Sequence, residues 1–365
     1  MKRHNRLKKH TLGLAAALLV TAGMSQIALA GDSVYVNTSS LRYRTSAQIK
    51  DNNIAGNLSY GQKLERVGTS GQWTMILLNG KKYYVSSAYV TSKKPASAGA
   101  VQTTSQTAAG AQTSGGTAIA LSSNYKYANY SKINSGTATL YSSTASNKKN
   151  KVVCVNAGHG TNGGGSVKTQ CHPDGSAKVT GGTTGAGATS AVAVSSGMTF
   201  ADGTAESKVT LAMAKVLKTK LLNAGYDVLM IRESDDVQLD NIARTVIANN
   251  NADCHIALHW DSTSSNKGAF FMSVPSNATY RAMEPVASHW KQHNQLGESL
   301  ISGLKSAGVK IYSKGSMEMD LTQTSYSTIP SVDIELGDKA SDHSGATLET
   351  LANGLLTGVN TFFGQ

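Results

Sequence analysis

The sequence predicts an α/β domain with a mostly parallel sheet flanked by helices, preceded by a small all-β barrel. After residue 150, buried-type strands alternate with stretches of helical periodicity, as in a parallel sheet with crossover helices. Between residues 31 and 91, short strands follow one another closely with turn signals between them, which indicates a small barrel. Residues 92–150 separate the two and are rich in Ala, Ser, Thr, Gly and Gln through residue 115. Such a composition predicts a low-complexity linker.

Residues 1–30 have the pattern of a signal peptide. Five Lys and Arg residues lie within the first nine positions, an apolar run covers 11–22, and an Ala-Leu-Ala cleavage motif ends at Ala30. The apolar run is too short to span a bilayer. We therefore expect a secreted protein with no membrane span after cleavage.

Charge and cysteine content limit the classes of partner and site. The formal charge is +12, and the leader holds five basic and no acidic residues, so the mature chain carries +7. This charge favours anionic surfaces, and we expect no nucleic-acid partner. Cys154, Cys171 and Cys254 form no CxxC motif, so no cysteine metal site or redox motif is indicated. We interpret Cys154 and Cys254, on predicted strands, as core thiols.

The elements of the two domains follow from periodicity and turn signals. In residues 31–91 the predicted strands are 33–36, 41–44, 63–67, 73–77 and 82–85. In residues 151–365 the predicted strands are 152–156, 226–231, 254–259 and 331–336, and the predicted helices are 207–223, 240–250, 296–307 and 347–362. Gly225 stands just past the first of these helices, where a helix commonly ends.

Four candidate site residues lie where this topology would bring them together. His159 and His259 stand at the carboxyl ends of predicted strands, Glu206 opens a helix, and Glu335 ends the last strand. Ligands of open α/β sheets bind beyond these strand ends. Two His and one Glu suit a catalytic zinc with one open position, and a further carboxylate can move protons. Alone, however, a strand-end His is usually an ordinary surface or core residue, and a Glu in a first helical turn usually interacts with the helix dipole.

The sequence segments around these residues are more specific indicators of function than the single residues. The segments VVCVNAGHG (152–160), ESKVTL (206–211), IARTVIANNNADCHIALHWDS (242–262) and PSVDIELG (330–337) occur in this order. They resemble the motifs of the zinc-dependent N-acetylmuramoyl-L-alanine amidases of the Amidase_3 type. The resemblance implies that His159, Glu206 and His259 bind one zinc ion and that Glu335 is the general acid/base. Arg244 is expected to support the local fold.

The resemblance also implies a substrate. It is the peptidoglycan amide between N-acetylmuramic acid and L-alanine of the stem peptide, hydrolysed by zinc-activated water. Two alternatives stay open: a weak or inactive wall-binding or regulatory protein, and a zinc peptidase that cuts within the stem peptide. The basic charge of the mature chain would favour binding to anionic wall polymers.

Several features depart from the family pattern. Asn156 replaces an Asp, Asp261 an Asn, and Asp338 an aromatic residue, and the two acids are expected to add negative charge near the metal. His159 and Glu206 are separated by 46 residues, most of which form an insert, 161–205, rich in Gly, Thr and Ser. A loop this long is usually a functional lid or disordered, and here it could shape the cleft. We interpret His172 in it as a polar loop residue rather than an added ligand, and His255 as structural.

The N-terminal segment has a resemblance of its own. LRYRTS (41–46), YGQKL (60–64), Gln72-Trp73 and NGKKYYVSSAYV (79–90) are similar to a bacterial SH3 (SH3b) domain. The resemblance implies a module that holds the enzyme on peptidoglycan, with Trp73 in its core. Tyr83 and Tyr84 depart from the usual Gly-Trp pair. The protein is therefore expected to be cell-wall associated.

Overall fold

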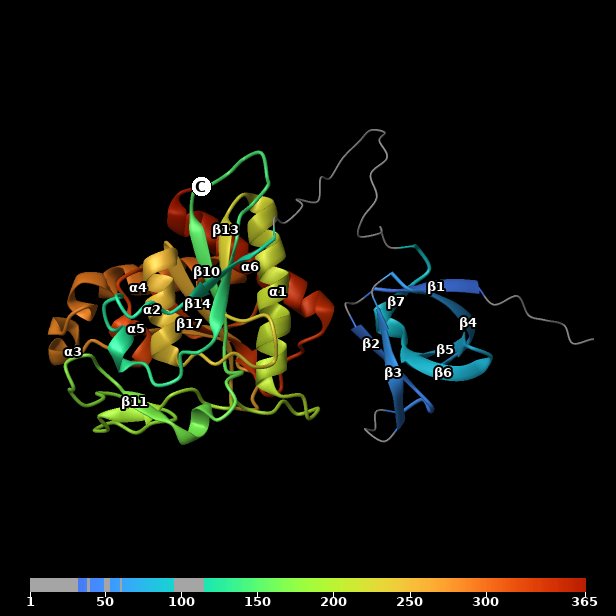
Figure 1. Cartoon of the computed structure of the whole chain (residues 1–365), viewed down its shortest axis with the longest axis horizontal. Helices are drawn as coiled ribbons and strands as arrows, with labels where there is room; N and C mark the ends of the chain where they lie inside the picture. The colour runs from blue at the N-terminus through green and yellow to red at the C-terminus, as the bar shows by residue number, and fades with distance from the viewer. Residues whose placement is uncertain (1–31, 38–39, 49–52, 60, 95–114) are drawn as a thin grey trace, which may run out of the picture. The chain divides into compact units, whose positions relative to one another are not determined.

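The structure is a computed structural model that describes residues 32–37, 40–48, 53–59, 61–94 and 115–365. The chain divides into two compact units, residues 1–107 and 108–365, which are drawn in Figure 1. The predicted signal peptide and residues 95–114 of the predicted linker lie outside the described residues. Of the helices in the described ranges, none has the length and apolar character that crossing a membrane requires.

The N-terminal unit is an antiparallel sheet. Its strands are β1 (Asp32–Val36), β2 (Ser40–Arg44), β3 (Ile54–Ser59), β4 (Lys63–Ser70), β5 (Trp73–Leu78), β6 (Lys81–Ser86) and β7 (Val90–Thr91), in the order β3-β2-β6-β5-β4-β1-β7. Alternate strand residues, such as Val34, Val36 and Ile76, form an apolar core. The all-β prediction is confirmed, while closure into an SH3-type barrel stays a prediction. Trp73 is half-buried rather than in this core.

The C-terminal unit is built on an eight-stranded sheet with the order β16-β15-β17-β14-β10-β13-β9-β8. The strands are β8 (Thr117–Ala120), β9 (Thr137–Tyr141), β10 (Val152–Ala157), β13 (Asp227–Met230), β14 (Cys254–Asp261), β15 (Ala269–Ser273), β16 (Ile311–Glu318) and β17 (Ser331–Asp338). The helices are α1 (Glu206–Ala224), α2 (Asn241–Asn251), α3 (Ala278–Ala282), α4 (Val286–Ser306), α5 (Thr322–Tyr326) and α6 (Gly345–Phe363). A separate pair, β11 (Lys168–Gln170) and β12 (Ser190–Val192), lies in the insert.

The sheet is mixed, which corrects the prediction of a mostly parallel sheet. The central strands β13, β10, β14 and β17 are parallel, as the alternation of strands and helices predicts. At one edge β9 pairs with β13 in the antiparallel direction, and β8 with β9. At the other edge β15 is antiparallel to β17. No α-helix lies between β8, β9 and β10 or between β14 and β15 in the sequence. The outermost strand β16 is again parallel to β15, and α3 and α4 lie between these two strands, as in a crossover connection.

The predicted linker is too long at its C-terminal end, because β8 and β9 lie within residues 92–150. Thr137–Tyr141 pairs with β13 over Thr139–Tyr141, and the side chain of Ala138 is fully buried. β8 (TAIA) and β9 (TATLY) consist mainly of Ala and Thr. Their composition therefore resembles that of the linker sequence before them.

Helices cover both faces of the central sheet (Figure 1). Val153 and Val155 of β10 share one core with the buried sides of α1, α4 and α6. Cys154, between them, points to the other face and packs with α2. Helix α1 ends at Gly225, whose φ of 101° allows its N–H to bond the carbonyls of the last turn. The layers therefore position the carboxyl ends of β10, β14 and β17 at one edge.

Candidate metal centre

Neighbouring strand ends bring the predicted site residues together. β10 and β14 are parallel, with Ala157 opposite Leu258, so His159 emerges beside His259. Glu335 lies directly opposite His259 on β17. Glu206, at the first turn of α1, completes the group. The four residues expected to converge at this edge do converge.

Two glycines make room for this convergence. A Cβ on Gly158 would lie 2.2 Å from the ring of His259. A Cβ on Gly197 would lie 2.7 Å from His159 and 2.8 Å from Glu206, and its φ of 81° also favours glycine. His159 itself has a φ of 63°, and its carbonyl accepts a hydrogen bond from Arg244 at 2.7 Å. The backbone around His159 is thus held in a conformation that few residues adopt unaided.

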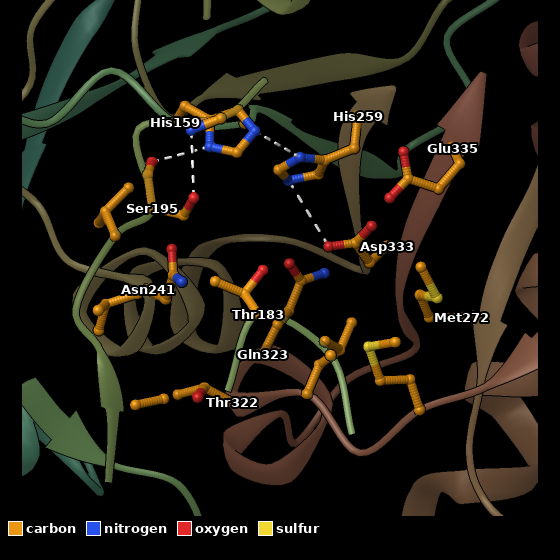
Figure 2. Close-up of a pocket in the computed structure, with 18 of the residues that line it drawn as sticks. His159, Thr183, Ser195, Asn241, His259, Met272, Thr322, Gln323, Asp333 and Glu335 are labelled. Carbon is orange, nitrogen blue, oxygen red and sulfur yellow. Dashed lines mark hydrogen bonds and ion pairs between the residues drawn. The ribbon is translucent and has the colours of Figure 1, made fainter. Parts of the chain in front are cut away.

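Three donor atoms converge, one each from His159, Glu206 and His259, and Figure 2 shows the two histidines. Nε2 of His159 lies 2.8 Å from Oε1 of Glu206, and Nδ1 of His259 lies 3.0 Å from Nε2 of His159. Nδ1 of His259 is also 3.2 Å from Oε1 of Glu206. A tetrahedral zinc with bonds of about 2.0–2.1 Å places its ligand atoms about 3.3 Å apart. The donor types and spacings fit such an ion.

The three donor atoms form a triangle, and backbone groups orient their side chains from outside it. The carbonyl of Ser195 lies 2.8 Å from Nδ1 of His159, which leaves Nε2 with a lone pair for a metal. The N–H groups of Met198 and Trp260 donate to Glu206 at 2.8 and 3.0 Å. Ser195 and Met198 belong to the insert. The insert therefore orients ligands as well as lining the cleft.

Charge at the site favours a cation. Burial by itself would raise the pKa of Glu206, but hydrogen bonds from both histidines lower it well below its ordinary value. Burial disfavours a protonated His259, yet the surrounding carboxylates, led by Asp333, raise its pKa to about 10. The carboxylates of the buried site thus favour a positive charge at the ring of His259, which a bound metal ion could supply in place of the proton.

Glu335 is suited to carrying a proton. Its side chain is buried, and Oε2 has no hydrogen-bond partner within the described structure. Burial raises the pKa of this carboxyl well above its ordinary value, and the nearby charge of Asp333 adds to the effect. A raised pKa brings a carboxyl closer to the range in which it can both accept and release a proton.

A cavity of about 560 Å³ extends from these residues. The insert forms much of its wall through Lys178, Gly182, Thr183, Thr184, Ala191, Val192, Val194, Ser195, Gly197 and Met198. Met272, Met319 and Gln323 line another part. The insert therefore shapes the cleft, in agreement with one of the two roles considered from sequence.

The remaining sequence-based interpretations have different outcomes. His172 is buried and contacts Ser176 and Asp320 rather than the ligand group. His255 is fully buried and structural. Asp261 pairs with Lys267 at 2.6 Å, and Asp338 accepts hydrogen bonds from surrounding backbone and hydroxyl groups. Only Asp261 of these two acids lines the cavity, and it is already paired.

Two features of the candidate site were missed by sequence reasoning. Asp333 lines the cavity beside His259. A period-2 argument could have found it, since it stands two residues before Glu335 and therefore faces the same side of the strand. Ser195 acts through its backbone carbonyl, which no residue type indicates.

Fold and site together define an α/β protein whose sheet edge carries a His–Glu–His group able to hold a metal ion. Residues 153–353 match the family model described as N-acetylmuramoyl-L-alanine amidase. The match covers more than half of the chain, and the protein belongs to this family.

Solved amidase structures show limited similarity to the chain. An N-acetylmuramyl-L-alanine amidase of Mycobacterium abscessus is 19% identical over 58% of this chain and 98% of its own, with a TM-score of 0.45. An amidase of Clostridium difficile 630 is 18% identical over 59% and 97%, with a TM-score of 0.42. An amidase of Nostoc punctiforme is 15% identical over 60% and 99%, also with a TM-score of 0.42. No curated protein matches the sequence.

Proposed function

We propose that the chain is a zinc-dependent N-acetylmuramoyl-L-alanine amidase. It would cleave the peptidoglycan amide between the lactyl group of N-acetylmuramic acid and L-alanine of the stem peptide. One observation carries the proposal: three N and O donor atoms converge within 3.2 Å of one another. They lie beside a buried carboxylate oxygen of Glu335 that has no hydrogen-bond partner among the described residues.

Each residue has a defined role in this proposal. His159 through Nε2, Glu206 through Oε1 and His259 through Nδ1 would hold the ion. When bound, zinc polarises the amide carbonyl and lowers the pKa of water. Glu335 accepts the proton of the attacking water on a carboxylate oxygen. It then donates that proton to the L-alanine nitrogen as the C–N bond breaks.

The other parts of the chain would bring the enzyme to its substrate. We propose that residues 1–30 direct secretion and that residues 31–91, as an SH3b domain, bind peptidoglycan. The mature charge of +7 would favour association with anionic wall polymers. Residues 95–114 would then connect the two units, and the enzyme would act at the cell wall.

Digestion of purified sacculi tests the reaction. Wild-type protein should release new L-alanine amino termini, and a chelator should abolish the release until zinc is restored. Glu335→Gln should bind one zinc ion per chain with the wild-type affinity but lose activity by about 10²–10⁴-fold. Glu349→Gln, at an exposed ion pair with Lys220, is the matched control and should retain activity.

Other outcomes identify the alternatives. New amino termini other than L-alanine would indicate a peptidase acting within the stem peptide. Zinc binding without release of any amino group would indicate a wall-binding or regulatory protein. Release that survives complete metal removal would contradict the zinc mechanism.

A further inference from the structure

Asp333 has no role in the reaction described above, although it lines the same cavity. Its side chain is 17% exposed, and Oδ1 is buried without a partner in the described structure. It stands on β17 two positions before Glu335, and the neighbouring strand carries His259. A buried carboxylate oxygen without a hydrogen-bond partner calls for an explanation.

The contact of Asp333 is with the far side of the His259 ring. Nδ1 of this ring lies in the donor triangle, 3.0 Å from His159 and 3.2 Å from Glu206. Nε2 points the other way and lies 3.6 Å from Oδ2 of Asp333, as Figure 2 shows. This separation is that of an ion pair rather than of a direct hydrogen bond.

A neutral histidine has one lone pair and one N–H, so a metal on Nδ1 requires the proton on Nε2. A carboxylate facing Nε2 favours that form of the ring and disfavours the form with the lone pair on Nε2. It also opposes rotation of the ring, which would turn an unprotonated nitrogen toward the negative charge.

The two histidines of the site use opposite nitrogens. His159 presents Nε2 to the triangle, and its Nδ1 faces the Ser195 carbonyl at 2.8 Å. His259 presents Nδ1, and its Nε2 faces Asp333. Each ring thus has an acceptor outside the triangle, and only His259 has a charged one.

We propose that Asp333 is a positioning residue that holds His259 with Nε2 protonated and Nδ1 directed at the metal. The inference rests on the proposed zinc site and deepens it. Asp333 is not in the group of converging donor atoms, so it acts through His259 rather than as a ligand.

The test compares zinc affinity among four full-length proteins: wild type, Asp333→Asn, Asp333→Leu and Asp261→Asn. Asp261 is the matched control because it also lines the cavity but is bound by Lys267 and Thr263. Competition with a chromophoric chelator should show affinity about 10–100-fold weaker for Asp333→Leu. Asp333→Asn, which keeps an acceptor oxygen but not the charge, should lie between, and Asp261→Asn should match wild type.

A spectroscopic readout separates positioning from general destabilisation. The visible absorption spectrum of the cobalt(II)-loaded protein reports ligand geometry. It should change in Asp333→Leu and stay unchanged in Asp261→Asn, while urea midpoints establish that each variant is folded. If Asp333→Leu does not fold, the isosteric Asp333→Asn decides by the same two measurements.

If wild type binds zinc, two results would overturn the assignment. Wild-type zinc affinity and cobalt spectrum in both Asp333 variants would show that His259 needs no such partner. Lost amide cleavage at unchanged metal affinity would place Asp333 on the substrate instead. Wild type that binds zinc but cleaves no amide would refute the proposed activity while the affinity ratios still decide the role of Asp333. Wild type that binds no zinc would refute both.

Discussion

The carboxylate of Asp320 lies 3.1 Å from Nε2 of His172, although 148 residues separate them in sequence. Asp320 also accepts bonds from Lys178 at 3.0 Å and from the N–H of Val179 at 2.7 Å, and it contacts the Thr180 hydroxyl. All four partners belong to the insert, and Asp320 is fully buried. One side chain thus fixes the insert to the segment before α5.

Replacing Asp320 should therefore loosen the insert. Asp320→Asn leaves the buried Lys178 without its counter-charge, which costs about 3–5 kcal/mol for a buried pair. Hydrogen exchange measured by mass spectrometry should accelerate across residues 161–205. Zinc affinity should also fall, because Ser195 would no longer be held against His159. Unchanged exchange across residues 168–192 would contradict the anchoring role.

The site could be predicted from sequence where a side chain carries its own local signal. His159, Glu206, His259 and Glu335 are chemically distinctive and stand at element ends, so topology alone brings them together. The Ser195 carbonyl has no such signal, because any residue supplies one. The Asp320 contacts depend on how the insert folds back over the sheet, and no short-range pattern encodes a pairing across 140 residues or more.

Asn156 leaves a buried cation without a carboxylate partner. Nη1 of Arg244 donates to Oδ1 of Asn156 at 3.0 Å, and the other hydrogen bonds of this guanidinium within the described residues go to carbonyl or hydroxyl oxygens. Burial, with the charge of Arg232, lowers the pKa of Arg244 to about 9. Asn156→Asp should thus stabilise the fold by about 1–2 kcal/mol at neutral pH through a charge-assisted bond.

Urea unfolding measures this gain, which should vanish in acid once the new carboxyl is protonated in both states. Asn249→Asp is the control. The Nδ2 of Asn249 donates to the Tyr326 carbonyl at 2.9 Å, a bond that a carboxylate cannot make, so this variant should be destabilised. A midpoint for Asn156→Asp below that of wild type would refute the prediction.

Two buried histidines should make the free energy of unfolding decrease as the pH is lowered. Burial lowers the pKa of both His255 and His293 to about 3, whereas the unfolded value is about 6.5. Between these values the unfolded chain binds protons that the folded chain does not. Stability should therefore decrease as pH falls below about 6.5, by up to about 1.4 kcal/mol per pH unit for each histidine.

Urea midpoints from about pH 7.5 to about 4.5, in the presence of a chelator, measure this slope. Both ring nitrogens of His255 lack partners within the described structure. His255→Phe should therefore reduce the slope in acid. Above about pH 7 the urea midpoints of the variant and wild type should depend on pH in the same way. Equal slopes for the two proteins in acid would show that His255 is not held neutral.

Cys154 and Cys254 should stay as separate thiols. They lie on the neighbouring strands β10 and β14, but Cys254 is opposite Val153 and Cys154 is opposite His255. Their side chains point to different faces of the sheet and pack in different cores. A thiol reagent should react with none of the three cysteines in native protein and with all three after anaerobic unfolding. Fewer than three thiols in the unfolded protein would indicate a disulfide.

Part of the predicted linker is held against the C-terminal unit by Asp240. The backbone N–H of Ile133 donates to Oδ2 of Asp240 at 2.9 Å, and the Ser131 hydroxyl does so at 3.0 Å. Oδ1 of Asp240 caps α2 through the N–H of Ala243. Helix α2 in turn carries Arg244, which holds the backbone of His159. Residues before the first strand of the family match thereby support the candidate metal site.

A fragment of residues 115–365 should therefore unfold at the same urea concentration as the C-terminal unit of the intact chain and bind zinc equally well. A fragment of residues 151–365 lacks β8 and β9, exposes the edge of β13, and leaves the buried carboxylate of Asp240 short of partners. It should be less stable by about 3–5 kcal/mol, the cost of leaving a buried charge without its partners, and should bind zinc more weakly. Equal midpoints for the two fragments would restore the linker interpretation of the whole of residues 92–150.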